Sequence, residues 1–269
     1  MSAAAFEVQQ VEYSYQGVAA LSGLSLVIPR GQRVVLLGAN GSGKSTLLRL
    51  LDALYFPDAG SVSAFGAPLT PAAMADEAQA YAFRRRVGLV FQNPDVQLFN
   101  ASVFDELAFG PLQLQWPAPR IRERVERTLA EMGLAHLRDR PPYRLSGGEK
   151  KKVALASVLV ADPEVLLLDE PSAALDPQSK SWLIETLIDW GGGAKTLVMA
   201  THDLDIVEDV ADLCLVLQDG RLVAQGSPAA ILGDSDLLRR TGLIHAHRHR
   251  HGDGAAHSHA HFHYAKRSK

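Results

Sequence analysis

Short apolar runs alternate along this sequence of 269 residues with segments whose apolar residues recur at helical spacing. Arg33 to Leu37, Val165 to Leu168 and Thr196 to Ala200 lack the polar alternation of a half-exposed strand, so they predict buried strands. Lys44 to Leu54 and Lys150 to Ala161 have helical spacing and predict helices. Strands that alternate with helices indicate an α/β fold with a largely parallel, buried sheet.

Other segments extend this pattern. Four further strands and a hairpin around Asp219-Gly220 are predicted at Phe6 to Val11, Leu24 to Ile28, Gly60 to Phe65, Val87 to Phe91, and Leu213 to Leu217 with Arg221 to Gln225. The first two strands flank a turn at Gln16-Gly17. From about Pro111 to Met132 the pattern changes to a helix rich in Arg and Glu, which Pro117 and Pro119 introduce.

Composition places the main body among globular proteins, with 47% hydrophobic and 21% charged residues. The formal net charge of -3 gives no bulk argument for binding nucleic acid. Cys214 is the only cysteine, so no disulfide forms within the chain, which fits a reducing compartment. We expect neither a signal peptide nor a membrane span, because no run approaches roughly 18 apolar residues. Any membrane role then depends on a partner.

A glycine-rich segment follows the strand that ends at Leu37. Gly38 to Ser45 match the pattern G-x-x-x-x-G-K-[ST], between a strand and a helix. Glycines let backbone N–H groups converge on phosphate oxygens, and the helix N-terminus favours negative charge. We expect Lys44 to reach the β- and γ-phosphates of a nucleotide and Ser45 to coordinate Mg²⁺. The residues expected to bind the nucleotide here are Gly38, Asn40, Gly41, Ser42, Gly43, Lys44, Ser45 and Thr46.

Two acids stand at the end of the apolar run Val165 to Leu168. Burying Asp169 and Glu170 beside a core is costly unless a cation compensates their charge. Asp169 suits the coordination shell of Mg²⁺, and Glu170 suits a group that polarises the attacking water. Together with the phosphate loop, the pair predicts hydrolysis of a nucleoside triphosphate.

Leu145 to Glu149, followed by three lysines, resembles the signature motif of ATP-binding-cassette (ABC) proteins. A serine hydroxyl, two glycine amides and a helix N-terminus make a second anion site. By itself the segment also fits a helix cap followed by a solvated lysine run. The resemblance implies that Ser146, Gly147 and Gly148 cap the γ-phosphate of ATP on a second copy, in a head-to-tail homodimer. Glu149 stands where Gln is commoner.

Further motifs of the family follow in the expected order. Gln92 resembles the Q-loop glutamine, Asp176 lies in a D-loop-like segment, and His202 resembles the switch histidine. Tyr15 resembles the aromatic residue that stacks on adenine, with Tyr13 as the alternative. The resemblance implies an ATPase that uses ATP and Mg²⁺. Its implied catalytic residues are Lys44, Gln92, Glu170 and His202, and its implied Mg²⁺ ligands are Ser45, Gln92 and Asp169.

The resemblance covers about residues 6–225 and also implies the architecture. We expect a P-loop NTPase (RecA-like) core, an N-terminal antiparallel β subdomain and an inserted α-helical subdomain at about 93–160. These parts would form one ABC ATPase domain at 1–240. Residues 241–269 would form a disordered, His-rich tail.

One branch of the family fits best. Val90 to Phe99, Phe109 to Pro111 and the lysine-rich signature helix resemble the ATPases of energy-coupling-factor (ECF) transporters. ECF systems import vitamins, cobalt or nickel, and they use a transmembrane coupling (T) subunit and a substrate-binding membrane (S) subunit. The resemblance implies a peripheral protein at the cytoplasmic face of the cell membrane, and other importers share much of the pattern.

Eight of the ten histidines alternate with other residues in the tail. In an extended chain this alternation puts successive imidazoles on one face, and imidazole binds Ni²⁺, Co²⁺ and Zn²⁺. The candidate metal ligands are His245, His247, His249, His251, His257, His259, His261 and His263. A solvated tail or an added tag is the plainer interpretation. With the ECF resemblance, the tail favours nickel or cobalt as the cargo.

Two rival classes lack the expected sequence features. A metallochaperone-like P-loop GTPase needs Asn-Lys-x-Asp to recognise guanine, and none of the three asparagines (Asn40, Asn93, Asn100) precedes a lysine. A soluble cassette ATPase of DNA repair usually carries a long coiled coil, and the segment between Lys44 and Ser146 leaves no room for one. We therefore expect an ATPase that energises nickel or cobalt import, with import of a vitamin or of another metal such as zinc as the alternative.

Overall fold

The structure is a computed structural model that describes residues 4–244, 247–250 and 256–259. Its two larger sheets contain β1 (Ala4–Tyr15), β2 (Val18–Pro29), β3 (Arg33–Leu37), β4 (Ala59–Ala64), β5 (Ala67–Pro68), β6 (Val87–Val90), β7 (Val165–Asp169), β8 (Thr196–Thr201), β9 (Leu213–Gln218) and β10 (Arg221–Gly226). Its α-helices are α1 (Lys44–Leu51), α2 (Pro71–Ala75), α3 (Glu77–Arg84), α4 (Val103–Gln113), α5 (Ala118–Glu131), α6 (Gly147–Leu159), α7 (Pro177–Trp190), α8 (Val207–Val210), α9 (Pro228–Gly233) and α10 (Ser235–Arg240). Short 3-10 turns are η1 (Pro94–Val96), η2 (Ala135–Leu137), η3 (Pro142–Arg144) and η4 (Leu204–Ile206).

A six-stranded sheet forms the centre of the fold, with the strand order β10-β9-β3-β8-β7-β6. The neighbours from β9 to β6 are parallel, and β10 pairs antiparallel with β9 at one edge. Strand β3 has the predicted bounds, and β7 and β8 each extend one residue beyond theirs. The prediction of an α/β fold with a largely parallel sheet is confirmed.

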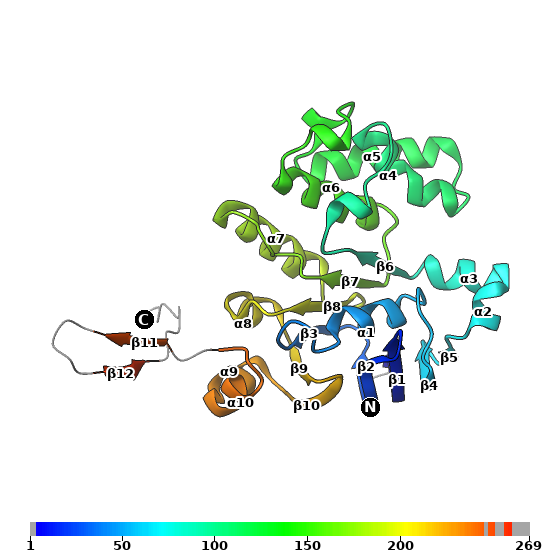
Figure 1. The fold of residues 1–269 in the computed structure, drawn as a ribbon. Helices are drawn as coiled ribbons and strands as arrows, with labels where there is room; N and C mark the ends of the chain where they lie inside the picture. Colours follow the sequence, from blue (N-terminus) through cyan, green and yellow to red (C-terminus); the bar gives the residue numbers. More distant parts are fainter. Residues whose placement is uncertain (1–3, 245–246, 251–255, 260–269) are drawn as a thin grey trace.

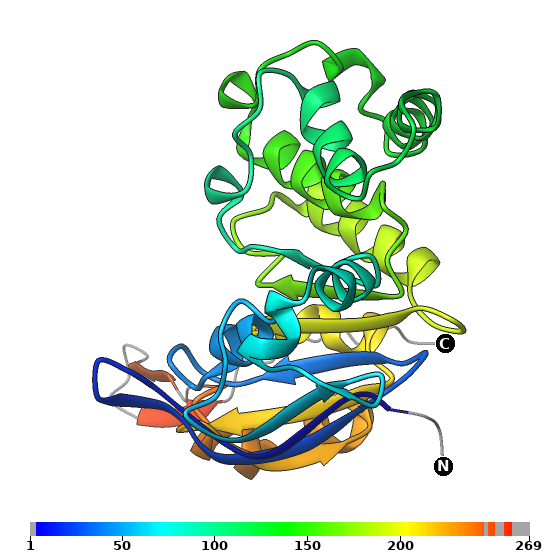
Figure 2. The same cartoon turned by 90° about the vertical axis from the view of Figure 1, so that its right-hand side faces the viewer.

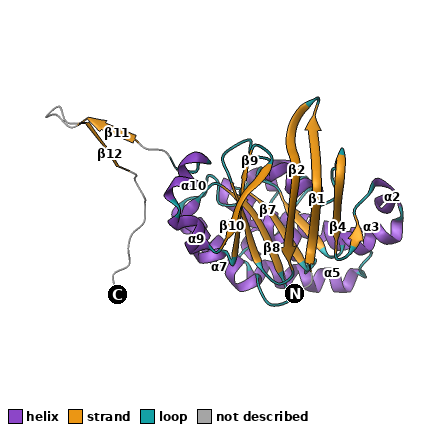
Figure 3. Ribbon diagram, turned by 90° about the horizontal axis from the view of Figure 1, so that it is seen from below, coloured by secondary structure: helices purple, strands orange, loops and turns teal. Residues whose placement is uncertain are grey.

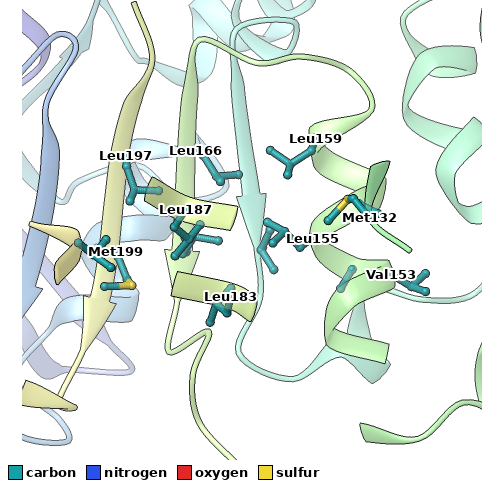
Figure 4. Close-up of a cluster of buried hydrophobic side chains, with 14 of the residues drawn as sticks. Met132, Val153, Leu155, Leu159, Leu166, Leu183, Leu187, Leu197 and Met199 are labelled. Atoms are coloured by element: carbon teal, nitrogen blue, oxygen red, sulfur yellow. The ribbon is translucent and has the colours of Figure 1, made fainter. Parts of the chain in front are cut away.

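Both faces of this sheet are covered, because successive residues of its strands belong to different cores. Val34 and Leu36 pack in the core that contains α1 and the N-terminal strands. Val35 and Leu37 pack in the core that contains α6 and α7. All four side chains are fully buried. Figure 4 shows the second core, where side chains of β7, β8, α6 and α7 meet.

A second sheet has the order β2-β1-β4-β5 and is antiparallel, as predicted for the N-terminal part. Figure 3 shows β1, β2 and β4 side by side. Strands β1 and β2 have 12 residues each, longer than predicted. Gln16 and Gly17 turn with φ of 48° and 83°, so pairing continues out to Tyr15 and Val18.

Helices α4, α5 and α6 form the upper part of the molecule in Figures 1 and 2. The sequence analysis does not predict α4, because Pro111 normally ends a helix. Ser102 caps α4 by accepting a hydrogen bond from the Asp105 N–H (3.1 Å). Buried Glu106 accepts two backbone N–H groups of the preceding loop, at 2.9 and 2.8 Å. These bonds fix the start of α4, and Pro111 lies in its last turn.

The C-terminal tail is described only in part. Strands β11 (His247–Arg250) and β12 (Ala256–His259) pair as an antiparallel ribbon. Histidine alternation in these two segments has the two-residue period of a strand, and the disorder of the tail as a whole stays a prediction. Of the other tail residues, 241–244 are described, and 245–246, 251–255 and 260–269 lie outside the described residues. Within the described ranges, no helix has both the length and the apolar character of a membrane span.

Candidate functional site

Three loops converge at one edge of the central sheet, because neighbouring parallel strands end there. Strands β3, β8 and β7 are adjacent and end at Leu37, Thr201 and Asp169. The register pairs Leu37 with Thr201 and Asp169 with Ala200. The phosphate loop follows Leu37, His202 follows Thr201, and the acidic pair consists of Asp169 itself and the next residue, so residues far apart in the sequence meet at one site.

The phosphate loop turns sharply into α1. Gly43 has φ of 102°, and a Cβ there would lie 2.7 Å from Leu21 Cδ2 and 2.8 Å from the Ala20 carbonyl oxygen. Only glycine fits this position without displacing its neighbours. The buried Ser42 hydroxyl has no hydrogen-bond partner among the described residues. A polar group left free inside a glycine cradle fits the binding of a phosphate oxygen.

Lys44 is almost fully buried, with 5% of its surface exposed. Its Nζ donates to the carbonyl oxygens of Gly38 (2.7 Å) and Ala39 (3.2 Å) and lies 3.7 Å from Glu170 Oε1. Burial lowers the pKa of this ammonium group, and the neighbouring Glu170 and Asp169 carboxylates oppose that shift. Charged phosphate oxygens are stronger hydrogen-bond acceptors than carbonyl oxygens, so a bound phosphate would compete with the two carbonyls for the Lys44 ammonium group.

Ser45 and Asp169 form a pair of oxygen ligands. The Ser45 hydroxyl donates to Asp169 Oδ1 at 2.8 Å, and Asp169 is buried. Burial raises the pKa of the Asp169 carboxyl. A divalent cation would offset the cost of burying this carboxylate, and Mg²⁺ prefers such oxygen ligands. The donor set therefore fits Mg²⁺.

Glu170 is held in a fixed orientation by its neighbours. Its Oε1 lies 2.9 Å from His202 Nδ1, and its Oε2 accepts from the Thr201 hydroxyl at 3.3 Å. Its backbone has φ of 46°, a left-handed conformation that strains a residue other than glycine. Strain of this kind gathers at functional sites. A buried carboxylate fixed in this way can orient a water molecule and accept its proton.

An open cleft of about 330 Å³ lies over these groups. The predicted site residues that line it are Tyr15, Asn40, Gly41, Gly43, Lys44, Ser45, Thr46, Gln92 and Glu170. Val18, Ala19 and Ala20 of β2 complete the lining. The cleft is thus lined by apolar residues of β2 on one part and by the glycine-rich phosphate loop on another.

The two candidate tyrosines occupy different environments. Tyr15 is 37% exposed and lines the cleft, and its hydroxyl lies 3.3 Å from Thr46 Oγ1. Tyr13 packs against the core and stacks on Tyr55, with ring centroids 5.5 Å apart. This arrangement favours Tyr15 as the side chain that meets a base.

The signature and D-loop residues do not line this cleft. Ser146 caps α6 by a reciprocal pair of hydrogen bonds with Glu149, and Ser146 and Gly147 are exposed. Asp176 caps α7 by accepting from the Ser179 N–H and hydroxyl, at 3.0 and 2.7 Å. Helix α6 lies in the upper part of the molecule in both Figures 1 and 2, away from α1.

Two residues that the sequence analysis did not single out also contact the site. Thr201 contacts Glu170 and also accepts the Asp203 N–H at 3.0 Å. Arg49 donates to the Tyr15 hydroxyl at 3.3 Å. A signal was present in both cases, since Thr201 directly precedes His202 and Arg49 lies one helical turn beyond the phosphate loop.

Comparison with known proteins agrees with this geometry. The family profile described as ABC transporter matches residues 21–173. The nickel import ATP-binding protein NikO of Rhodobacter capsulatus is 61% identical, over 89% of this chain and 96% of its own length. The energy-coupling factor transporter ATP-binding protein EcfA of Methanothermobacter thermautotrophicus is 39% identical, over 88% of this chain and 75% of its own.

A solved structure is also similar. It is that of cbiO1 from Clostridium perfringens, part of the ABC transporter complex cbiONQ, with a TM-score of 0.76 and 36% identity. The match covers 90% of this chain and 96% of that one. The chain belongs to the ABC transporter family, as an ATP-hydrolysing subunit of the energy-coupling-factor type.

Proposed function

We propose that this ATPase energises the import of nickel or cobalt ions through an ECF-type transporter. The observation that carries the proposal is the 61% identity to a nickel import ATP-binding protein across 89% of the chain. The tail supports it, since eight alternating histidines suit a soft or borderline divalent cation. Import of a vitamin or of zinc by the same machinery is the alternative.

The cleft supports a mechanism of in-line attack by water on the γ-phosphate of ATP. Lys44 and the loop amides would hold the phosphates, and Tyr15 would stack on the adenine. Ser45, Asp169 and Gln92 would hold Mg²⁺, which neutralises charge on the phosphate oxygens when bound. Glu170 would orient the water and accept its proton, with His202 beside it near the γ-phosphate.

The exposed signature residues support a head-to-tail homodimer. Ser146, Gly147 and Gly148 lie at the N-terminus of α6, outside their own cleft, and the Ser146 hydroxyl donates to Glu149. Such a terminus attracts anions, so it would complete the ATP site of a second copy. Asp176, exposed nearby at the start of α7, would lie at the same interface.

A groove of about 540 Å³ supports docking of a membrane partner. It lies between α3, α4 and the end of α6, and Tyr81, Phe109 and Gln113 line it. Phe109 and the neighbouring Leu112 are 38% and 55% exposed. We propose that a cytoplasmic helix of the T subunit docks here, which places the protein at the cytoplasmic face of the membrane. The S subunit would bind the cargo.

Transport in proteoliposomes tests this function. The chain is reconstituted with its T and S subunits, ATP is enclosed on the side of the ATPase, and uptake of radioactive nickel is measured. Nickel uptake that requires ATP, and that excess cobalt inhibits more than excess vitamin, supports the proposal. Absence of ATP-dependent nickel uptake would contradict the proposal and favour a vitamin as the cargo.

The tail needs its own test, because it is separable from the ATP site. Deletion of residues 245–269 is expected to abolish most nickel binding in equilibrium dialysis of the purified chain. Binding to the full chain is expected to weaken as pH falls through about 6.5, where imidazole gains a proton. The truncated chain should retain its ATPase activity. Equal nickel binding by both chains would assign the tail no role in metal capture.

A further inference from the structure

The three lysines after the signature motif contact three different segments, although a lysine run usually forms a solvated face. Lys150 Nζ donates to Asp95 Oδ1 of η1 at 2.6 Å. Lys151 Nζ donates to carbonyl oxygens of the segment that follows Glu170. Lys152 Nζ lies 4.6 Å from the ring centroid of Trp182 in α7. The start of α6 is therefore tied to its surroundings in three directions.

The segment reached by Lys151 is conformationally strained. Glu170 and Ala174 both have left-handed φ, of 46° and 58°, without being glycines. Two backbone hydrogen bonds of 3.2 Å each turn the chain here, from the Ala173 N–H to the Glu170 carbonyl and from the Leu175 N–H to the Ser172 carbonyl. A strained conformation persists only where the surroundings fix it. Residues 171–176, here called the D-loop segment, therefore need anchors from outside.

Two anchors from different elements hold this segment. From α6, the half-buried Lys151 ammonium group donates to the carbonyl oxygens of Pro171 (3.2 Å) and Ala173. From the loop after β8, Asp203 Oδ2 accepts from the Ser172 hydroxyl at 3.3 Å and lies 2.6 Å from Lys180 Nζ. Hydrogen bonds from a charged donor are the stronger kind, so Lys151 is the main link to α6.

Close packing reinforces the link between the signature motif and the D-loop segment. A Cβ added at Gly148 would lie 3.1 Å from Ser179 Oγ, which donates a hydrogen bond to Asp176, the N-cap of α7. A cavity of about 20 Å³ lies here, and Gly148, Lys151 and Ser179 help to line it. The signature motif and the start of α7 therefore lie close to each other.

We propose that Lys151 is a positioning residue that ties the signature motif to the D-loop segment and Glu170 of the same chain. The inference rests on the proposed homodimer, in which the signature motif serves the ATP of the partner. Engagement of that ATP would then be transmitted through Lys151 to the group that orients water at the chain's own site. The two ATP sites would thus be coupled within each subunit.

Substitution of Lys151 tests this coupling with two readouts. Lys151→Met removes the charge and the N–H donors while keeping most of the side-chain volume. Lys151→Arg keeps a positive charge and N–H donors. Lys150→Met is the matched control, because it removes a neighbouring lysine that does not reach the D-loop segment. Steady-state ATPase kinetics and hydrogen–deuterium exchange of amides 172–176 are measured on each full chain. Lys151→Gln is measured as well, in case the methionine variant does not fold.

The expected result for Lys151→Met is at least fivefold faster exchange at 172–176 and a kcat about tenfold lower, with KM within about twofold of wild type. Lys151→Arg should restore both readouts, and Lys150→Met should leave both unchanged. Wild-type exchange in Lys151→Met, or a kcat equal to that of Lys150→Met, would overturn the proposal. Ser146→Arg reports separately on the dimer: wild-type turnover in that variant would refute the shared site, whereas the exchange result for Lys151 would stand.

Discussion

Replacing Glu170 by Gln isolates the carboxylate charge from the shape of the site. Gln has the size of Glu, so contacts with Thr201 and His202 can persist at 3.3 and 2.9 Å. The change removes the negative charge 3.7 Å from Lys44 Nζ, in a place where both side chains are about 5% exposed. Lys44 then has less competition for phosphate oxygens, so ATP binding should be kept or strengthened.

The loss should fall on turnover. A positioned general base contributes about 100- to 10,000-fold to a reaction rate, which corresponds to roughly 2.7 to 5.4 kcal/mol of activation free energy. We expect kcat of Glu170→Gln to fall by about that factor. Phosphate release in the steady state measures kcat, and the fluorescence of a labelled ATP analogue measures binding.

A matched control separates this effect from a general loss of charge. Glu164 precedes β7 at its other end and pairs with Arg86 at 2.9 Å, on the surface. Glu164→Gln should therefore leave kcat near wild type. If Glu170→Gln kept more than about a tenth of wild-type turnover, Glu170 would not be the group that activates water.

Three other predictions follow from the same structure. Tyr15→Ala should weaken ATP binding roughly 5- to 150-fold in fluorescence titration, the range expected for one base stacked on one ring. Tyr13→Ala should instead lower the melting temperature, because Tyr13 packs against the core. Gly43→Ala should abolish nucleotide binding in the same titration, since φ of 102° and a contact at 2.7 Å force the loop to move. Arg33 lowers the pKa of Asp212 through their hydrogen bond, so the folded state binds fewer protons than the unfolded state. The pair therefore stabilises the fold at neutral pH, and its contribution is lost as pH falls below about 4. In denaturant unfolding at pH 7, the free energy of unfolding of wild type should exceed that of Arg33→Leu by under ~1 kcal/mol, and this difference should vanish at low pH. A difference that does not change with pH would contradict the pairing.

The central sheet could be predicted closely because its strands are buried on both faces. A strand such as β3 must be apolar throughout when its alternate residues enter two cores, and this leaves an unbroken apolar run in the sequence. Helix α4 was missed although Ser102 is a typical N-cap, because Pro111 near its end normally breaks a helix. Helix α7 was missed although Asp176-Pro177 is a typical helix start.

The residue types of the site were more predictable from the sequence than the tertiary contacts that hold them in place. The roles proposed for Lys44, Asp169 and Glu170 depend on residue type and on a place at or just after the end of a strand, and the structure brings these residues into one site. The contacts of Lys151 depend on how α6 packs against residues 171–176, and no local pattern encodes that. The proposed partner of the signature motif is a second copy of the chain, and no contact within one chain tests that role, so it remains a prediction.

Cellular metal content tests the central claim most directly. Cells that carry the full transporter, with either the wild-type or the Glu170→Gln subunit, are offered Ni²⁺, Co²⁺, Zn²⁺ and Mn²⁺, and each metal is measured by mass spectrometry. We predict accumulation of nickel or cobalt with the wild-type subunit and its loss with the variant. Equal content of every metal in both cells would contradict the assignment of a metal importer.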